Sequence, residues 1–459
     1  DPEEYDKKYK EWNLEVLRMM PEKMELVVIR QTAKQYQAVK AQLYRKDVGE
    51  IIIATDAGRE GELVARWILE KAQCRKPIKR LWISSVTDKA IKDGFAHLKD
   101  GRSYNRLYDA AVSRAEADWL VGINATRALT CKYNAQLSCG RVQTPTLAMI
   151  AAREEEIRNF KPQDYYGIRL SAGKMRWTWQ EKKSGSSRTF QKDRAQQIQT
   201  AASGSLLTIL SVEKSSKKTG APGLYDLTEL QRDANKKFGF SAKETLNIMQ
   251  RLYENHKVLT YPRTDSRYIG TDVVPTLQER LKACAVGPYR KLAGPLSIKP
   301  VKTNKSFVDD KKVSDHHAII PTEQFVQLEH MTNEERRIYD LVVRRFLAVL
   351  YPPFEYEQTS LKAEAGGEIF TAKGKIVKNP GWKAAYEEAD GDEEEEEFQN
   401  LYEVKEGEKL KIDSCQLTEG KTKPPAHFTE ATLLSAMENP VRFLSTKDQE
   451  AAKTLGETG

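Results

Sequence analysis

Strand-like sequence occurs in two blocks that a long helical block separates, and this order limits the possible folds more than any single motif. Strand patterns cover residues 165–171, 175–180 and 206–212, and they return from residue 354 to about residue 413. Between residues 226 and 350, apolar side chains recur at helical spacing instead. We therefore predict one β domain that is interrupted by a helical insertion.

An α/β unit precedes these blocks. Its clearest strand is residues 50–55, with an apolar centre that is typical of buried parallel strands. Other elements are expected at residues 26–29 (strand), 32–44 (helix), from 63 onward (helix), 79–83 (strand), 88–160 (mostly helical) and 214–220 (basic linker). The fold class that follows is multidomain, with α/β and α+β units.

The length of 459 residues allows about three domains. The predicted units are a truncated α/β domain (1–100), a helical domain (first part 101–162), a β domain (first part 163–222), the helical insertion (223–352), the second part of the β domain (353–422) and a truncated second part of the helical domain (423–459).

The charge balance favours a polyanionic partner. The net charge is +8, but residues 387–397 hold nine carboxylates and no basic residue, so the rest of the chain carries +17. That acidic run is expected to be a surface loop. Five scattered cysteines form no C-x-x-C pair, which argues against a zinc ribbon and favours a reducing compartment. We expect no membrane segment and, without a G-x-x-x-x-G-K-[ST] motif, no ATP site.

Two carboxylates follow the strand at residues 50–55, within the sequence T-D-A-G-R-E-G-E. Asp56 lies at the carboxyl end of that strand, where ligands bind in such sheets, and Glu60 comes about one helical turn later. Together they could hold a hard divalent cation such as Mg²⁺. The alternative is a helix N-terminus that carries acidic residues because the helix dipole favours them.

A second candidate site is the sequence L-S-C-G-R-V-Q-T-P-T-L, residues 137–147. Thr144 is a suitable N-cap and Pro145 a suitable first helical residue. The amides of that helix start, together with Arg141, would form an anion site, and Gly140 would let the backbone approach a ligand closely. The alternative is an ordinary junction between a loop and a helix.

The sequence K-V-L-T-Y-P-R-T-D-S-R, residues 257–267, places a tyrosine and an arginine two positions apart. A capping box at residue 241 starts the preceding helix, and Pro262 biases Tyr261 toward an extended backbone after a short strand. Arg263 then lies on the same side as Tyr261, where its guanidinium would favour the phenolate and bind phosphodiester oxygens. The alternative is a half-buried tyrosine in a turn.

These motifs, in this order, resemble those of type IA DNA topoisomerases. T-Y-P-R-T-D-S resembles the family's active-site stretch, T-D-A-G-R-E-G-E the acidic loop of the TOPRIM domain, and L-S-C-G-R-V-Q the motif that lies along single-stranded DNA. D-H-H-A-I-I-P-T (315–322) resembles the stretch whose histidine bonds the scissile phosphate, and K-P-P-A-H-F-T-E (423–430) resembles the return of the chain to the helical domain. D-A-G-R-E-G-E and T-P-T-L resemble in particular the bacterial topoisomerase III branch. The implied fold is a TOPRIM domain followed by helical and β domains in a toroidal core.

The resemblance also implies roles for single residues. Tyr261 would attack a backbone phosphate of single-stranded DNA and form a 5′-phosphotyrosine, while Arg263 and His316 stabilise the phosphoryl oxygens. Asp56 and Glu60 would hold Mg²⁺ and so align the DNA for resealing. The implied DNA contacts are Ser138, Cys139, Gly140, Arg141, Val142, Gln143, Arg127 and Arg263. The alternatives are a structural histidine at 316 and a solvated arginine at 127.

The implied activity is ATP-independent relaxation of negatively supercoiled DNA or decatenation. A cytoplasmic, nucleoid-associated monomer is expected, with a helicase as a candidate partner. Two departures bear on this. The acidic loop of the family has the pattern D-x-D-x-E, and here Gly58 replaces the middle acid. The family also has a glutamate on an earlier strand, and no matching segment is found before residue 25. The alternative is therefore a fragment that binds single strands without cleaving them. A TOPRIM primase or nuclease would leave Tyr261 without a role.

Overall fold

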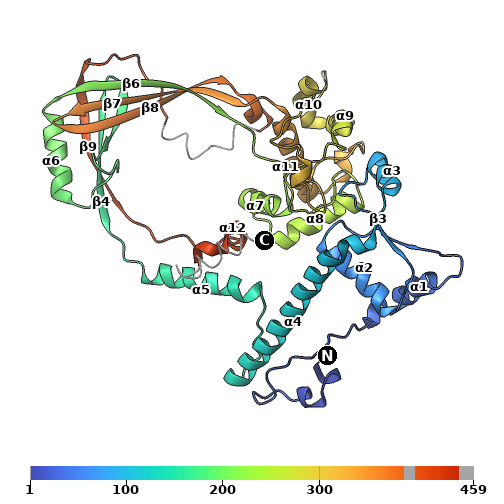
Figure 1. Cartoon of the computed structure of the whole chain (residues 1–459). Coiled ribbons are helices and arrows are strands. Elements are labelled where there is room, and N and C mark those ends of the chain that lie inside the picture. The colour runs from blue at the N-terminus through green and yellow to red at the C-terminus, as the bar shows by residue number, and fades with distance from the viewer. Residues whose placement is uncertain (1, 299, 387–397, 444–459) are drawn as a thin grey trace.

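The computed structural model describes residues 2–298, 300–386 and 398–443. A β-barrel, a helical insertion and a pair of helices are arranged as a ring, and the N-terminal α/β unit lies beside the insertion (Figure 1). This arrangement is the multidomain core that the sequence predicts. The acidic run 387–397 lies outside the described residues, so its place in a surface loop stays a prediction.

The N-terminal unit contains a three-stranded sheet in the order β1-β2-β3. The first two strands are parallel, and the third is antiparallel to the second. Leu43, Ile53, Ala65, Leu69 and Ala72 form its small core. The elements are α1 (Ala33–Leu43), β1 (Ile51–Ile53), α2 (Arg59–Lys71), β2 (Ile78–Arg80), α3 (Asp88–Ala96) and β3 (Lys99–Asp100).

The predicted strand at residues 26–29 is wrong. These residues pair with no strand in the part of the chain that is described, and Val27 and Ile29 are 62% and 65% exposed. A strand is stable only where its amide and carbonyl groups find partners, and an apolar pattern alone does not supply them.

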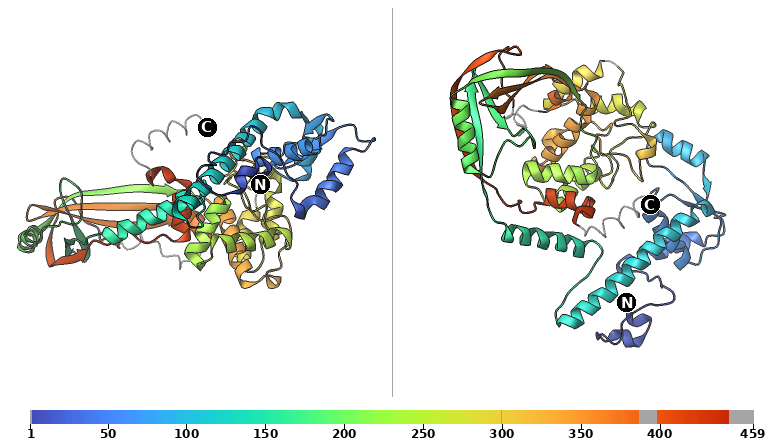
Figure 2. Two further views of the ribbon diagram at one scale, coloured as in Figure 1. Left: turned by 90° about the horizontal axis from the view of Figure 1, so that it is seen from below. Right: turned by 60° about the vertical axis from the view of Figure 1, so that its left-hand side comes forward.

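Two long helices follow. α4 (Asn105–Tyr133) packs against α2, and Figure 2 shows it crossing beside the α/β unit. α5 (Gln143–Asn159) begins before the predicted N-cap, with Val142 at the cap position. Thr144 is therefore inside the first turn, where its Oγ1 accepts a hydrogen bond from the Gly140 amide at 3.0 Å. Pro145 also lies in this first turn, where its missing N–H costs no helical hydrogen bond.

Six strands close into a barrel with the order β4-β5-β8-β7-β6-β9. The strands before and after the helical insertion thus belong to one sheet, as the sequence order predicts. Trp177, Trp179, Phe370 and Ile168 are buried inside it. The elements are β4 (Asp164–Ala172), β5 (Met175–Gln180), α6 (Lys192–Ser203), β6 (Leu206–Thr219), β7 (Phe354–Ala365), β8 (Glu368–Asn379) and β9 (Lys409–Lys421).

The basic linker predicted at residues 214–220 is wrong for all but its last residue. β6 continues to Thr219 and pairs with β7 from Thr208↔Glu364 to Thr219↔Phe354. The lysines and serines of this run are strand residues, because a partner from the far side of the insertion satisfies their backbone groups. The sequence pattern also did not predict α6, which packs against β4 and β9.

The helical insertion lies between β6 and β7 and has its own large core, which includes Leu230, Met249, Leu259, Ile320 and Phe346. Capping boxes start α8, at Ser241 with Glu244 as predicted, and α11, at Thr332 with Glu335. The helices are α7 (Leu227–Phe238), α8 (Ala242–Glu254), α9 (Leu277–Cys284), α10 (Arg290–Ser297) and α11 (Asn333–Leu350).

The last described α-helix, α12 (Glu430–Glu438), closes the ring. It packs on α7 and also contacts α5. The Ala431 amide donates to Asn235 Oδ1 at 3.1 Å, and the side chains of Arg232 and Glu438 form an ion pair. Seen from below, the barrel lies at one end of the molecule and the helical units at the other (Figure 2). Within the described ranges, no helix is long and apolar enough to cross a membrane.

Candidate active site

The segment that carries Tyr261 lies alongside the segment that carries His316. The two chains meet at the isolated bridge Leu259↔Pro321, so the short strand predicted before Tyr261 is reduced to one bridge. Further bonds hold them together: Thr260 N donates to Ile320 O at 3.0 Å, and Thr264 Oγ1 donates to His316 O at 2.9 Å. The tertiary fold thus joins two motifs that are separated in the sequence.

Burial alternates along the tyrosine segment. Pro262, Thr264 and Ser266 are buried, whereas Tyr261 is half-buried and Arg263 is exposed. An extended chain sends alternate side chains to opposite sides, so Tyr261 and Arg263 share the outward side, as their spacing predicts. The Tyr261 phenol is therefore not enclosed in the core.

Aromatic neighbours surround the Tyr261 ring. The ring centroid lies 4.3 Å from that of His316 and 5.5 Å from that of Tyr253, which meets it edge-on from α8. Burial raises the pKa of Tyr261, the Asp56 carboxylate raises it further, and Arg263 lowers it. The predicted effect of Arg263, which favours the phenolate, is present, but burial and Asp56 outweigh it and the pKa of Tyr261 is raised.

The acidic loop after β1 meets the insertion at this place. His316 Nε2 lies 3.5 Å from Asp56 Oδ1, and Asp56 also acts on the pKa of Tyr261. Asp56, Tyr261 and His316 come from three distant parts of the sequence, and they converge here. Glu60 points elsewhere, to an ion pair with Arg114 of α4.

Asp56 and Glu60 are the two candidate metal ligands. The described residues contain no group of three or more His, Cys, Asp or Glu side chains that could hold a metal ion. Asp56 and Glu60 are, however, 58% and 65% exposed. Mg²⁺ usually keeps several waters and takes one or two carboxylates together with substrate phosphate oxygens. Two exposed carboxylates, of which Asp56 lies beside His316, are compatible with that mode of binding.

A buried ion pair that the sequence reading missed supports the acidic loop. Glu62 and Arg80 have no exposed side-chain surface, and Arg80 Nε donates to Glu62 Oε2 at 2.9 Å. Arg80 also donates to the carbonyl groups of Ile53, Thr55 and Asp56. A buried arginine with these bonds fixes the backbone that carries Asp56. The only sequence signal was the acid at residue 62, which looked like another helix-start carboxylate.

The second histidine of the D-H-H sequence has a structural role. Its Nδ1–H donates to Ala318 O at 2.7 Å. Burial lowers the pKa of His317 to about 4, so this ring is neutral at pH 7. The histidine that faces Tyr261 is therefore His316, as the resemblance implies.

One face of α4 holds the segment that precedes α5. Thr126 Oγ1 accepts from Cys139 N at 2.9 Å, and Thr130 Oγ1 donates to Leu137 O at 2.8 Å. Asp118, two turns earlier, bonds to Arg141 Nε at 2.8 Å and lies on the same face. The Arg141 guanidinium lowers the pKa of Asp118. These α4 residues, spaced by multiples of four, were not identified from the sequence.

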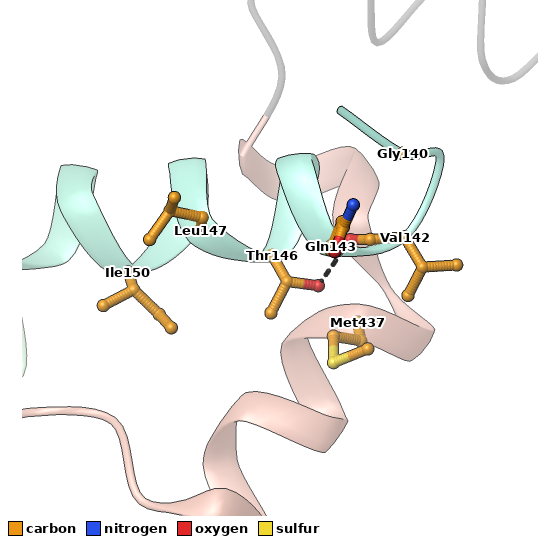
Figure 3. Close-up of a pocket in the computed structure, with 7 residues that line it drawn as sticks. All are labelled: Gly140, Val142, Gln143, Thr146, Leu147, Ile150 and Met437. Atoms are coloured by element: carbon orange, nitrogen blue, oxygen red, sulfur yellow. Dashed lines mark hydrogen bonds between the residues drawn. The ribbon is translucent and has the colours of Figure 1, made fainter. Parts of the chain in front are cut away.

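This segment presents most of the predicted DNA contacts to solvent. Ser138, Arg141, Val142 and Gln143 are exposed, and Cys139 and Gly140 are half-buried. A pocket of about 650 Å³ opens beside it between α5 and α12 (Figure 3). Its lining is Gly140, Val142, Gln143, Thr146, Leu147, Ile150 and Met437.

Arg127 is the one predicted DNA contact that the structure contradicts. Its side chain is 2% exposed, donates to the carbonyl groups of Tyr9 and Glu11, and stacks on Trp12 with a 4.9 Å separation. It ties the N-terminal segment to α4 and is neither solvated nor free to bind a phosphate. The sequence around residue 127 did not indicate that this side chain is buried, because its contacts are with residues that are remote in sequence.

The comparisons identify the class. The family model described as "DNA topoisomerase" matches residues 102–442, and the model described as "Toprim domain" matches residues 7–86. The chain belongs to the DNA topoisomerase family, in its type IA, topoisomerase III-like branch. It is similar over its whole length to DNA topoisomerase 3 from Bacillus anthracis, at 61% identity over 463 residues, and from Bacillus subtilis (strain 168), at 58% over 461 residues.

The chain spans 63% of the length of these curated relatives. Among solved structures, full-length topoisomerase I from Thermotoga maritima matches with a TM-score of 0.68 and 23% identity, over 91% of this chain and 67% of that chain. At this identity the likeness concerns the fold, and it agrees with the predicted toroidal core.

Proposed function

We propose that the chain is the DNA-cleaving core of a topoisomerase III-like enzyme. It breaks single-stranded DNA transiently through a 5′-phosphotyrosine, passes a strand, and rejoins the break without ATP, and so relaxes negative supercoils or decatenates DNA. One observation carries this proposal: Tyr261, His316 and Asp56 meet at a solvent-accessible contact between the insertion and the acidic loop. A structural tyrosine would not need these neighbours.

The chemistry is an exchange of one phosphoester for another. The Tyr261 oxygen attacks phosphorus, the bond to the 3′ oxygen breaks, and the 5′ phosphate stays on the tyrosine. One proton leaves the phenol and one is gained by the 3′ oxygen, and one phosphoester bond forms as another breaks, so the step balances. Because burial raises the pKa of Tyr261, the phenol keeps its proton until it attacks.

Two side chains are placed to stabilise the phosphoryl charge. Arg263 is exposed on the side of Tyr261 and can bind two phosphate oxygens at once. His316, whose ring centroid lies 4.3 Å from that of Tyr261, can donate a hydrogen bond whether it is neutral or protonated. Charge-matched donors beside developing negative charge are the usual main source of rate enhancement.

The Toprim domain is generally a Mg²⁺-binding domain, and Asp56 and Glu60 would hold the ion here. When bound, Mg²⁺ supplies positive charge that aligns the DNA backbone for rejoining. The Arg114 and His316 side chains that now face these carboxylates would have to share them with the ion.

Single-stranded and negatively supercoiled DNA are the proposed substrates. Residues 138–143 would lie along a single strand, because α4 holds this segment and Arg141 at the surface. The basic balance of the chain outside residues 387–397 supports the same partner. We further propose a cytoplasmic, nucleoid-associated monomer that works with a helicase.

The test is Tyr261→Phe in the intact protein. Wild-type protein is expected to form a denaturant-resistant adduct with a single-stranded oligonucleotide labelled at its 3′ end, and Tyr261→Phe is expected to form none, because the phenol oxygen is the nucleophile. Single-strand affinity should change less than twofold. An adduct in the mutant would overturn the assignment. Binding without any adduct in the wild type would favour the alternative, a module that only grips single strands.

A further inference from the structure

Gly58 and Asp315 compete for one small volume at the contact between the acidic loop and the insertion. A Cβ atom on residue 58 would lie 2.0 Å from Oδ2 and 2.1 Å from Oδ1 of Asp315, and real Cβ contacts are essentially never shorter than 3.0 Å. The Asp315 carboxylate therefore fills the place that a side chain on residue 58 would take.

The backbone does not explain the glycine. Gly58 has φ −157° and ψ −177°, an extended conformation that any residue adopts. It is the N-cap of α2, where Ser, Thr, Asp or Asn would ordinarily provide a capping side chain, and it provides none. A larger residue here would require the Asp315 carboxylate to move.

The next residue of the insertion makes the adjacent contact. Asp315 lies on Gly58, and His316 Nε2 lies 3.5 Å from Asp56 Oδ1. Because Asp315 and His316 are consecutive, a group that displaced the first would also shift the second. The contact of Asp315 with Gly58, which we call the seat, thus sets how closely His316 approaches Asp56 and the Tyr261 ring.

Other carboxylates already act on the Asp315 carboxylate where it lies against Gly58. Burial raises the pKa of Asp315, and the carboxylates of Asp265 and Asp56 raise it further, against the opposing effect of His316 and Arg59. A second carboxylate in the same volume would add both a steric clash and a like-charge repulsion.

We propose that Asp315 supplies, from the insertion, the carboxylate that the pattern D-x-D-x-E would place on the loop at residue 58, and that this contact positions His316 for catalysis. The inference rests on the proposed function and adds a positioning residue to it. It makes residues 58 and 315 an interdependent pair, because the carboxylate can come from either side of the contact but not from both.

A double-mutant cycle in the intact protein tests the pair. Gly58→Asp and Asp315→Ala are each expected to slow adduct formation at least tenfold, the first by overfilling the seat and the second by emptying it. The combination Gly58→Asp with Asp315→Ala returns one carboxylate to the seat and is expected to come within about threefold of wild type. Single-strand affinity should stay within twofold throughout, which separates positioning from binding.

A double mutant that is no faster than the slower single mutant would overturn the proposal. If thermal melting shows that Gly58→Asp does not fold, Asp315→Ala decides alone, and a wild-type rate in that variant would likewise overturn it. Tyr261→Phe is run beside the series. If wild type and Tyr261→Phe both give no adduct, the proposed function fails, whereas a normal wild-type adduct without rescue contradicts only the pairing of residues 58 and 315.

Discussion

At the scale of single residues, the site works by placing opposed influences on one phenol. Burial and Asp56 keep the proton on Tyr261, while Arg263 opposes them. The phenol is therefore protonated in the resting protein, and under the proposed function it gives up its proton as it attacks. The neighbouring His317 has a structural role instead, as a neutral ring that donates a hydrogen bond.

His317 makes the stability of the protein depend on pH. Its pKa is about 4 in the folded chain and 6.5 when unperturbed, so the unfolded chain binds the proton first. Stability is therefore full above pH 6.5 and falls as the pH drops toward 4, by up to about 3 kcal/mol. Asp272, Arg280 and His316 are the charged or titratable groups that act on it.

His317→Gln removes this titration. Denaturant unfolding of the variant at a series of pH values is expected to show a shallower loss of stability between pH 6.5 and pH 4 than the wild type. The change at pH 7 should be small by comparison, since glutamine can still donate a hydrogen bond. Parallel curves for both proteins would contradict the assignment of His317 as a buried neutral ring.

At the scale of elements, helices hold irregular segments of the chain in position. α2 begins at the acidic loop, which Arg80 and Glu62 anchor from beneath. α4 holds the segment before α5 through side chains on a single face. Loop residues, including those proposed to meet DNA, gain precision in this way, because hydrogen bonds to a rigid helix replace the regular backbone bonds that a loop lacks.

Thr126→Val tests whether α4 holds the segment before α5 in position. The change keeps the shape but leaves the Cys139 amide without its 2.9 Å acceptor. Loss of such a bond costs about 1 kcal/mol, which corresponds to about a fivefold loss of single-strand affinity if residues 138–143 must keep this position. The measurement is fluorescence anisotropy with a labelled oligonucleotide.

The matched control is Ser113→Ala, whose hydroxyl bonds to the Asp109 carbonyl within α4. It is expected to bind DNA like the wild type. Equal affinity of the Thr126→Val variant and this control would show that the segment does not depend on its contact with α4.

At the scale of the whole molecule, the ring is closed by small contacts between large units. Long β6 and β7 strands join the barrel to the insertion, and α12 returns to the insertion by packing on α7. The second contact is maintained by a few polar bonds, among them Asn235 with Ala431 and Arg232 with Glu438. An interface of this kind can separate at a lower cost than either folded unit can unfold.

Asn235→Ala weakens that closure. The side chain donates to Phe240 O and accepts from Ala431 N, so its loss is expected to raise amide exchange in residues 430–438 about tenfold while the barrel strands keep their protection. Hydrogen exchange with mass spectrometry measures both regions in one sample. Asn247→Ala on α8, an exposed asparagine, is the matched control and should change neither region. Faster exchange in the barrel as well would mean that the ring unfolds as one unit.

Local sequence determined much of this protein. Turn and cap residues set the helix start at Ser241 and the helix end at Gly239, and the strand–helix–strand order of the chain already implied an interrupted β domain. The candidate residues Tyr261, Arg263, His316 and Asp56 could be chosen from short motifs, because each motif is local and resembles one of a known family.

Tertiary structure decided the rest, because contacts between remote segments leave no periodic trace. Residues 214–219 form a strand because β7 lies beside them and pairs with their backbone groups. Residues 26–29 remain unpaired because no described strand lies beside them. Arg127 was drawn into the interior by carbonyl groups more than a hundred positions away. The contact of Gly58 with Asp315 is of the same kind: a side chain on residue 58 would fall where the carboxylate of a residue distant in sequence lies.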